Sequence, residues 1–141
     1  MRFYVASGLE NFAAVREVSA ELKALGHQQT YDWTEHCDVR DQGGERMRQV
    51  AGREVAAVLE ADLVIALLPG GRGTHTEIGL AVARAALTDK GQVWLWSQDG
   101  SHFMPDERTC TFYFHPRIRR FCGDIKQVLE AVKENWGEIV P

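Results

Sequence analysis

The sequence has no apolar run approaching the roughly 20 residues of a membrane-spanning helix, which argues against a membrane protein. It has no cysteine pair of the C-x-x-C type, so Cys37, Cys110 and Cys122 are expected to be free thiols of a cytoplasmic protein. No signal peptide precedes the first predicted strand, which favours the same location. An excess of positive charge is also missing. The formal net charge of -4 gives no electrostatic basis for binding a nucleic-acid polymer.

Metal-ligand spacing is absent among the five histidines, and the adjacent pair His36-Cys37 does not make a zinc site. We therefore expect neither a metal nor a cofactor. There is no internal repeat, low-complexity tract or linker. With 141 residues, 45% of them hydrophobic and 26% charged, the chain fits one ordinary globular domain over 1–141.

Apolar periodicity predicts strands and helices that alternate along most of the chain. Strands are predicted over 2–7, 27–33, 63–68, 92–96 and 109–115, and helices over 11–25, 45–61, 74–87 and from 125 to near Trp136-Gly137. Residues 34–44 are expected to form a mobile loop or lid, 97–108 a polar loop, and 116–121 a basic connector. This alternation predicts an α/β fold with a doubly wound, mainly parallel five-stranded sheet, a flavodoxin- or Rossmann-like three-layer sandwich.

A flavodoxin-like strand order, 2-1-3-4-5, would bring the ends of the first and third strands to either side of the topological switch point. The turns at those ends are Ser7-Gly8 and the loop over 70–76. Ligands of such sheets bind in the crevice at the switch point. These two turns are therefore expected to meet at a binding site.

The stretch Pro-Gly-Gly-Arg-Gly-Thr-His-Thr-Glu-Ile-Gly at 69–79 joins a buried strand to an alanine-rich helix. Glycines at such a turn expose backbone N–H groups at the positive end of the helix dipole, which favours an anion. Thr74 or Thr76 is predicted to cap the helix. The carboxylate of Glu77 lies in this corner, either as a functional group or as a first-turn partner of the dipole. The stretch matches neither the P-loop nor the G-x-G-x-x-G fingerprint.

A second carboxylate, Glu54, falls on the apolar arc of the helix over 45–61, four residues after Val50 and four before Val58. A carboxylate facing a core is costly unless it is paired or used. Glu54 therefore belongs to a site, lies near the rim, or pairs with Arg53 or Arg72.

Two carboxylates beside glycine-rich turns suit chemistry on a sugar that carries hydroxyls or a phosphate. One carboxylate attacks the anomeric carbon, and a second group orients it or transfers a proton. Tyr4, Tyr31 or Trp33 could stack on a base, although aromatic residues at strand ends also serve as core.

The segment 69–77 resembles the P-G-G-x-G-T-x-x-E motif of cytokinin-activating phosphoribohydrolases, although a second glycine-rich motif of those enzymes is missing. Nearly the whole chain is similar to the nucleoside 2-deoxyribosyltransferase superfamily. The opening strand of that family is matched by Tyr-Val-Ala-Ser-Gly at 4–8. Asp62 matches an Asp at the start of its third strand, and Gly73, Glu77 and Gly79 match its G-x-x-x-E-x-G nucleophile motif. Glu54 stands at the family's acidic position, eight residues before Asp62.

Two departures alter what the resemblance implies. Gly71 replaces an Asp that contacts the base in the transferases, and the second acid is Glu54 rather than Asp. Nucleotide hydrolases of the same superfamily bind a 5′-phosphate at a serine or glycine in this loop, and Gly71-Arg72-Gly73 fits that subtype better. Arg72 is then either a phosphate or base contact or a solvated loop residue.

The resemblance implies an enzyme that cleaves or transfers at the N-glycosidic bond of a nucleoside or nucleoside 5′-monophosphate. Glu77 would be the nucleophile, and Glu54 would position it or handle protons. The expected substrate-binding residues are Tyr4, Ser7, Gly8, Trp33, Gly71, Arg72, Gly73 and Thr74. A homodimer or larger homo-oligomer is also implied, with Phe112, Tyr113 and the arginines at 117–120 as interface candidates. The alternative is a non-catalytic module that senses a nucleotide.

Overall fold

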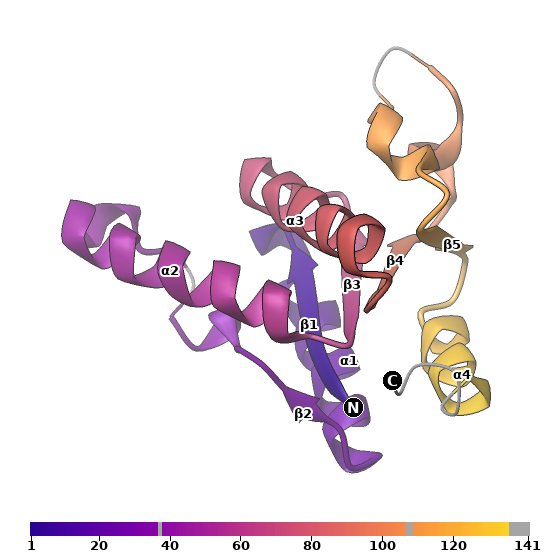
Figure 1. Cartoon of the computed structure of the whole chain (residues 1–141), viewed down its shortest axis with the longest axis horizontal. Helices are drawn as coiled ribbons and strands as arrows, with labels where there is room; N and C mark the ends of the chain where they lie inside the picture. Colours follow the sequence, from indigo (N-terminus) through magenta and orange to yellow (C-terminus); the bar gives the residue numbers. More distant parts are fainter. Residues whose placement is uncertain (37, 107–108, 136–141) are drawn as a thin grey trace.

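A computed structural model describes residues 1–36, 38–106 and 109–135 of the chain. Its five parallel strands form one sheet in the order β2-β1-β3-β4-β5, which confirms the predicted topology (Figure 1). The strands are β1 (Arg2–Ser7), β2 (Gln28–Gln29), β3 (Leu63–Leu68), β4 (Gln92–Ser97) and β5 (Ile118–Cys122).

The helices form the outer two layers of an α/β sandwich (Figure 1). They are α1 (Phe12–Ala24), α2 (Gly44–Glu60), α3 (Arg72–Thr88) and α4 (Lys126–Glu134). Helix α2 packs beside α3, and α1 contacts α4. The predicted α/β three-layer architecture is therefore confirmed.

The two central strands carry the core, because both of their faces are covered by helices. Phe3, Tyr4, Val5 and Ala6 of β1 are fully buried, and every residue of β3 is buried as well. Such two-sided burial explains why both strands are apolar runs without polar alternation. Ser7 pairs with Leu67 in the register, so β1 and β3 end at the same edge of the sheet. The turns that follow them are thereby brought together.

The predicted fifth strand at 109–115 is wrong. Thr111–Phe114 is a 3₁₀ turn, η5, and the strand is formed by the segment expected to be a basic connector. Strand β5 is an edge strand whose Arg119 and Arg120 are exposed, so its composition resembles that of a connector. The aromatic run instead turns Tyr113 inward, where the side chain is buried.

The segment 27–33, predicted as a short strand and its exit, forms a strand only at Gln28 and Gln29, which pair with β1. The chain then bends into the 3₁₀ turn η2 (Trp33–Glu35), where the side chain of Asp32 accepts a hydrogen bond from the backbone N–H of Thr34. The predicted loop at 34–44 contains a further 3₁₀ turn, η3 (Arg40–Gln42). Cys37, within this loop, lies outside the described residues.

Helix α3 begins at Arg72, two residues earlier than predicted, and Gly71 is its N-cap. Neither Thr74 nor Thr76 caps it, and the Thr76 hydroxyl donates to the Arg72 carbonyl instead. Glu77 therefore lies beyond the first turn, which removes its interpretation as a first-turn dipole partner. The predicted end of the last helix, near Trp136, falls outside the described residues.

Candidate active site

A cavity of about 510 Å³ lies where β1 and β3 end, at the switch point of the sheet. Its walls come from the turn after β1, the glycine-rich turn after β3, the N-terminal parts of α2 and α3, and the described residues of the loop after β2, Trp33, His36 and 38–40. Its volume is within the range of about 300–1,000 Å³ that is typical of small-molecule sites. The sequence-based prediction that the Ser7-Gly8 turn meets the 70–76 loop is thus confirmed.

Most of the predicted site residues lie on the wall of this cavity. Ser7 and Gly8 come from the end of β1, and Gly71, Gly73 and Thr74 come from the turn and first residues of α3. Trp33, Glu54 and Glu77 complete the set. The carboxylates of α2 and α3 therefore share one cavity with the glycine-rich turn.

Glu77 is the most enclosed acid of the cavity, with 8% of its surface exposed. The Tyr4 hydroxyl, on the neighbouring strand β1, donates a hydrogen bond of 2.5 Å to Oε1 of Glu77. The pKa of Glu77 is raised to about 8, chiefly by burial, while the Tyr4 hydrogen bond lowers it and the charge of Glu54 raises it. Tyr4 holds one carboxylate oxygen, so the orientation of the other is fixed.

Glu54 is half-buried on α2 and makes no ion pair with Arg53 or Arg72, both of which are among the described residues. The predicted alternative that Glu54 pairs with one of these arginines is therefore wrong. Burial raises the pKa of the Glu54 carboxyl, and the nearby His36 lowers it. A cavity-lining carboxyl whose pKa is raised by burial is suited to exchange a proton with a bound molecule.

Side-chain hydrogen bonds hold the two turns of the site together. The Ser7 hydroxyl donates to the Leu67 carbonyl at 2.7 Å, and the Asn11 amide donates to the carbonyls of Leu67 and Pro69 at 3.3 and 3.1 Å. A Cβ added at Gly70 would lie 2.4–2.9 Å from atoms of Thr74, so the turn requires glycine there. The glycine-rich wall of the cavity is consequently anchored to the end of β1 and to Asn11, the N-cap of α1.

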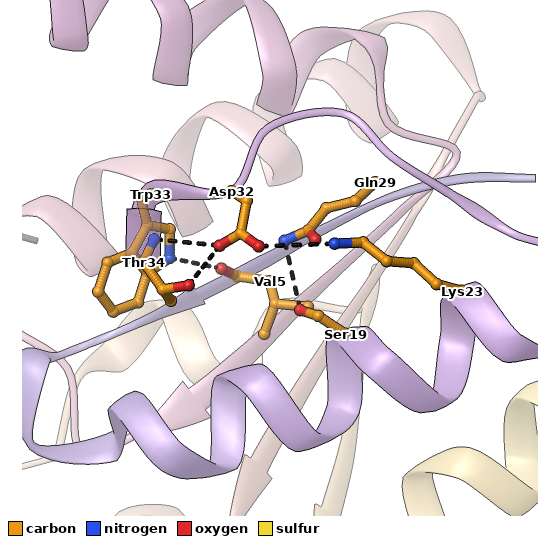
Figure 2. A network of polar contacts seen from close by, with 7 residues as sticks. All are labelled: Val5, Ser19, Lys23, Gln29, Asp32, Trp33 and Thr34. Carbon is orange, nitrogen blue, oxygen red and sulfur yellow. Dashed lines mark hydrogen bonds and ion pairs between the residues drawn. The ribbon is translucent and has the colours of Figure 1, made fainter. Parts of the chain in front are cut away.

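The aromatic wall of the cavity is Trp33, whose indole N–H donates to the Val5 carbonyl of β1 at 2.9 Å (Figure 2). Next to it, Asp32 accepts hydrogen bonds from the Thr34 backbone and hydroxyl and forms an ion pair with Lys23 of α1 (Figure 2). Trp33 is thereby fixed in position although it lies in a loop, and its ring packs edge-on against Phe12.

Two predicted substrate-binding residues are not on the cavity wall. Tyr4 is fully buried and reaches the site only through its bond to Glu77. Arg72 is exposed at the start of α3 and does not line the cavity. Tyr31, the other stacking candidate, instead places its hydroxyl 2.7 Å from Nε2 of His36. None of these three residues lines the cavity.

Four cavity residues carry polar chemistry that the sequence did not reveal, namely Glu10, His36, Asp38 and Arg40. Three of them come from the irregular segment after β2, where no periodicity relates sequence position to direction in space. The Arg40 guanidinium binds both carboxylate oxygens of Asp38, which lowers the pKa of Asp38 to about 2. The only sign of these residues in the sequence was that charged side chains cluster near them.

Among residues 1–36, 38–106 and 109–135, no three His, Cys, Asp or Glu side chains gather as metal ligands. In the same ranges no helix is long and apolar enough to cross a bilayer.

No family model matches the sequence, and a search of curated proteins gives no match either. The structure is similar to that of the CMP N-glycosidase BcmB of Clostridium botulinum, with a TM-score of 0.64. The match covers 95% of this chain and 98% of that one, at 18% sequence identity. The two proteins share a fold over nearly their whole lengths.

Proposed function

We propose that this protein cleaves the N-glycosidic bond of a nucleoside or nucleoside 5′-monophosphate, with Glu77 as the nucleophile. The observation that carries the proposal is a buried Glu77 carboxylate, held by the Tyr4 hydroxyl, in a cavity walled by glycines and an indole. The likeness of the fold to that of a CMP N-glycosidase supports the choice of bond.

In the first step, the free carboxylate oxygen of Glu77 attacks C1′ of the sugar as the bond to the base breaks. The product is a glycosyl ester of Glu77, and configuration at C1′ is inverted once. Burial supports this role, because a poorly solvated carboxylate is the stronger nucleophile once it is ionised. The Tyr4 hydrogen bond stabilises that ionised form.

The departing base takes the bonding electrons and needs a proton, which Glu54 donates from the opposite helix. The ionised Glu54 then accepts a proton from water, whose oxygen attacks C1′ of the ester and releases Glu77. The sum is hydrolysis with retention at C1′ and both carboxyls restored. If a second base enters in place of water, the same intermediate gives transfer.

The remaining walls have binding roles in this proposal. Gly71, Gly73 and Thr74 offer backbone N–H groups near the N-terminus of α3, and Ser7 and Gly8 face them across the cavity. Trp33 gives a rigid apolar face for the base, since its indole N–H is already bonded within the protein. No cofactor takes part.

We further propose that the protein acts as a cytoplasmic homodimer through α2. Met47, Val55 and Leu59 are 42%, 40% and 44% exposed, and with Ala51 they recur every four residues along one face. Met47 and Ala51 also line the cavity, so a second copy on this face would border its open side. Unpaired thiols at Cys110 and Cys122 support a reducing compartment.

The test is chromatographic detection of free base from ribo- and deoxyribonucleosides and their 5′-monophosphates, each with and without a second base. Glu77→Gln is expected to lose at least about 1,000-fold in activity because it removes the nucleophile. The matched control is Glu60→Gln, an exposed carboxylate on α2 outside the cavity, and it should retain full activity.

Base release without an acceptor establishes hydrolysis, and release only with an acceptor establishes transfer. If no substrate of the panel is cleaved but some bind, and Glu77→Gln binds them equally well, the enzyme proposal is wrong. The protein would then be a nucleotide-sensing module.

A further inference from the structure

The charged groups of the described cavity wall are unsuited to a phosphate. Four residues bring carboxylates, Glu10, Asp38, Glu54 and Glu77, and the basic side chains among the described lining residues are Arg40 and His36. Arg40 Nε lies 2.9 and 2.8 Å from the two oxygens of Asp38, so this pair is internally neutral. His36 Nε2 lies against the Tyr31 hydroxyl at 2.7 Å.

Glu10 is the exposed carboxylate of the set and lies over Gly8. A Cβ built on Gly8 would be 2.3–2.7 Å from the Glu10 carboxylate atoms, so the absence of a side chain at residue 8 makes room for it. The carboxylate therefore covers one of the two glycine turns that border the cavity. No hydrogen bond or ion pair from another described residue neutralises it.

A phosphomonoester is bound in proteins by N–H groups together with Arg or Lys side chains that offset its charge of nearly -2. Here the glycine-rich turn supplies backbone N–H groups, but the charged side chain at the facing turn is the carboxylate of Glu10. Arg72, the sequence-based candidate for a phosphate contact, is exposed and does not line the cavity. A carboxylate is, in contrast, a good acceptor for a sugar hydroxyl.

We infer that the cavity takes a nucleoside with a free sugar hydroxyl and rejects the corresponding 5′-monophosphate, and that Glu10 imposes this choice. The inference rests on the proposed function and narrows its substrate class. Glu10 accepts a hydrogen bond from the sugar hydroxyl and repels the phosphate dianion. The substrate preference thus differs from that in the name of the structurally similar CMP N-glycosidase.

The test compares kcat/KM for a nucleoside and its 5′-monophosphate in the wild-type protein, Glu10→Gln and Glu10→Lys. Because two like charges a few ångströms apart repel strongly, the wild type should prefer the nucleoside by at least about tenfold. Glu10→Gln should reduce that ratio, and Glu10→Lys should invert it. The control Glu17→Gln, an exposed acid on α1 outside the cavity, should leave the ratio unchanged.

Gly8→Ala is a second, independent variant, since its methyl group would push the Glu10 carboxylate aside and should also lower the ratio. A wild-type preference for the monophosphate, or a ratio that Glu10→Gln leaves within about twofold, overturns the inference. If nothing in the panel is cleaved, the proposed function fails. In that case the inference is tested separately by calorimetry, which measures the affinities of the wild type and of Glu10→Gln for the nucleoside and for the monophosphate.

Discussion

The Tyr4 hydroxyl lies 2.5 Å from Oε1 of Glu77, across 73 residues of sequence, and joins β1 to the helix after β3. Both residues are nearly or fully buried, so the bond is shielded from water. Burial and the adjacent carboxylate raise the pKa of Tyr4, which keeps its hydroxyl protonated as a donor. Tyr4 therefore positions the nucleophile and favours its ionised form.

Tyr4→Phe removes this donor while keeping the ring in the core. A hydrogen bond to a charged group is worth about 1.5–3 kcal/mol, so kcat should fall about 10- to 100-fold at neutral pH. The pKa of Glu77 should rise above about 8, because the Tyr4 hydrogen bond lowers it. KM should change little, since Tyr4 does not line the cavity. Kinetics of the purified variant check this, and a change confined to KM would contradict it.

The pH profile of kcat/KM should be bell-shaped, because the active form is the singly protonated pair in which the proton has moved from Glu77 to Glu54. With the pKa of Glu77 raised to about 8 and that of Glu54 also raised, the pair loses its last proton near pH 8. Activity should therefore fall above about pH 8, when no acid remains to protonate the base.

Glu54→Gln tests the proton donor directly. Activity on ordinary nucleosides should drop about 10²–10⁴-fold, whereas a sugar with a nitrophenolate leaving group should still react, because that group needs no proton. On that substrate the profile should become a single limb that rises with pH as Glu77 ionises. Equal losses on both substrates would contradict a proton-donor role.

Stability should also depend on Glu77. The folded-state pKa of Glu77, about 8, exceeds the ordinary value of 4.5, so folding favours the protonated side chain. The contribution of this protonated form to the free energy of unfolding is complete below about pH 4.5 and is lost as the pH rises to about 8. Glu77→Gln, which cannot ionise, should melt several degrees above the wild type at pH 9, and this difference should shrink towards pH 5. Differential scanning calorimetry across this range measures it, and a pH-independent difference would argue against a buried titrating carboxyl.

His75 and Tyr113 connect α3 to the segment between β4 and β5. His75 Nδ1 lies 2.7 Å from the Gly71 carbonyl, which only accepts, so Nε2 accepts from the Tyr113 hydroxyl at 2.7 Å. A double-mutant cycle with His75→Ala and Tyr113→Phe should give a coupling energy of about 1 kcal/mol by denaturant unfolding. Additive effects of the two changes would show that the contact does not stabilise the fold.

Val55→Lys with Leu59→Lys tests the proposed dimer, because two charges on the exposed face of α2 oppose burial against a second copy. Light scattering after size exclusion should report a dimer for the wild type and a monomer for this variant. A lysine at Phe112, an exposed residue of the interface expected from the sequence, should leave the dimer intact. A wild-type monomer at high concentration would refute the proposal.

The sequence determined the fold class, the strand order and the placement of Glu77 and Glu54 at the switch point of the sheet, because these depend on short-range signals. Buried apolar runs, helical periodicity and a glycine-rich turn are readable from neighbouring residues, and the topology then brings the turns after β1 and β3 together. Gly8, Gly71, Gly73, Thr74 and Trp33 were found for the same reason.

Only the tertiary structure decided the direction of each side chain around those turns. Tyr4 points to Glu77 instead of the cavity, and Glu10 folds over Gly8, because long-range packing sets these contacts. The edge strand β5 was missed because its two adjacent arginines interrupt the apolar alternation that would identify a half-buried strand. Its pairing with β4 is, in addition, a non-local interaction that the sequence does not reveal. His36, Asp38 and Arg40 reach the cavity from irregular backbone, for which no sequence period exists.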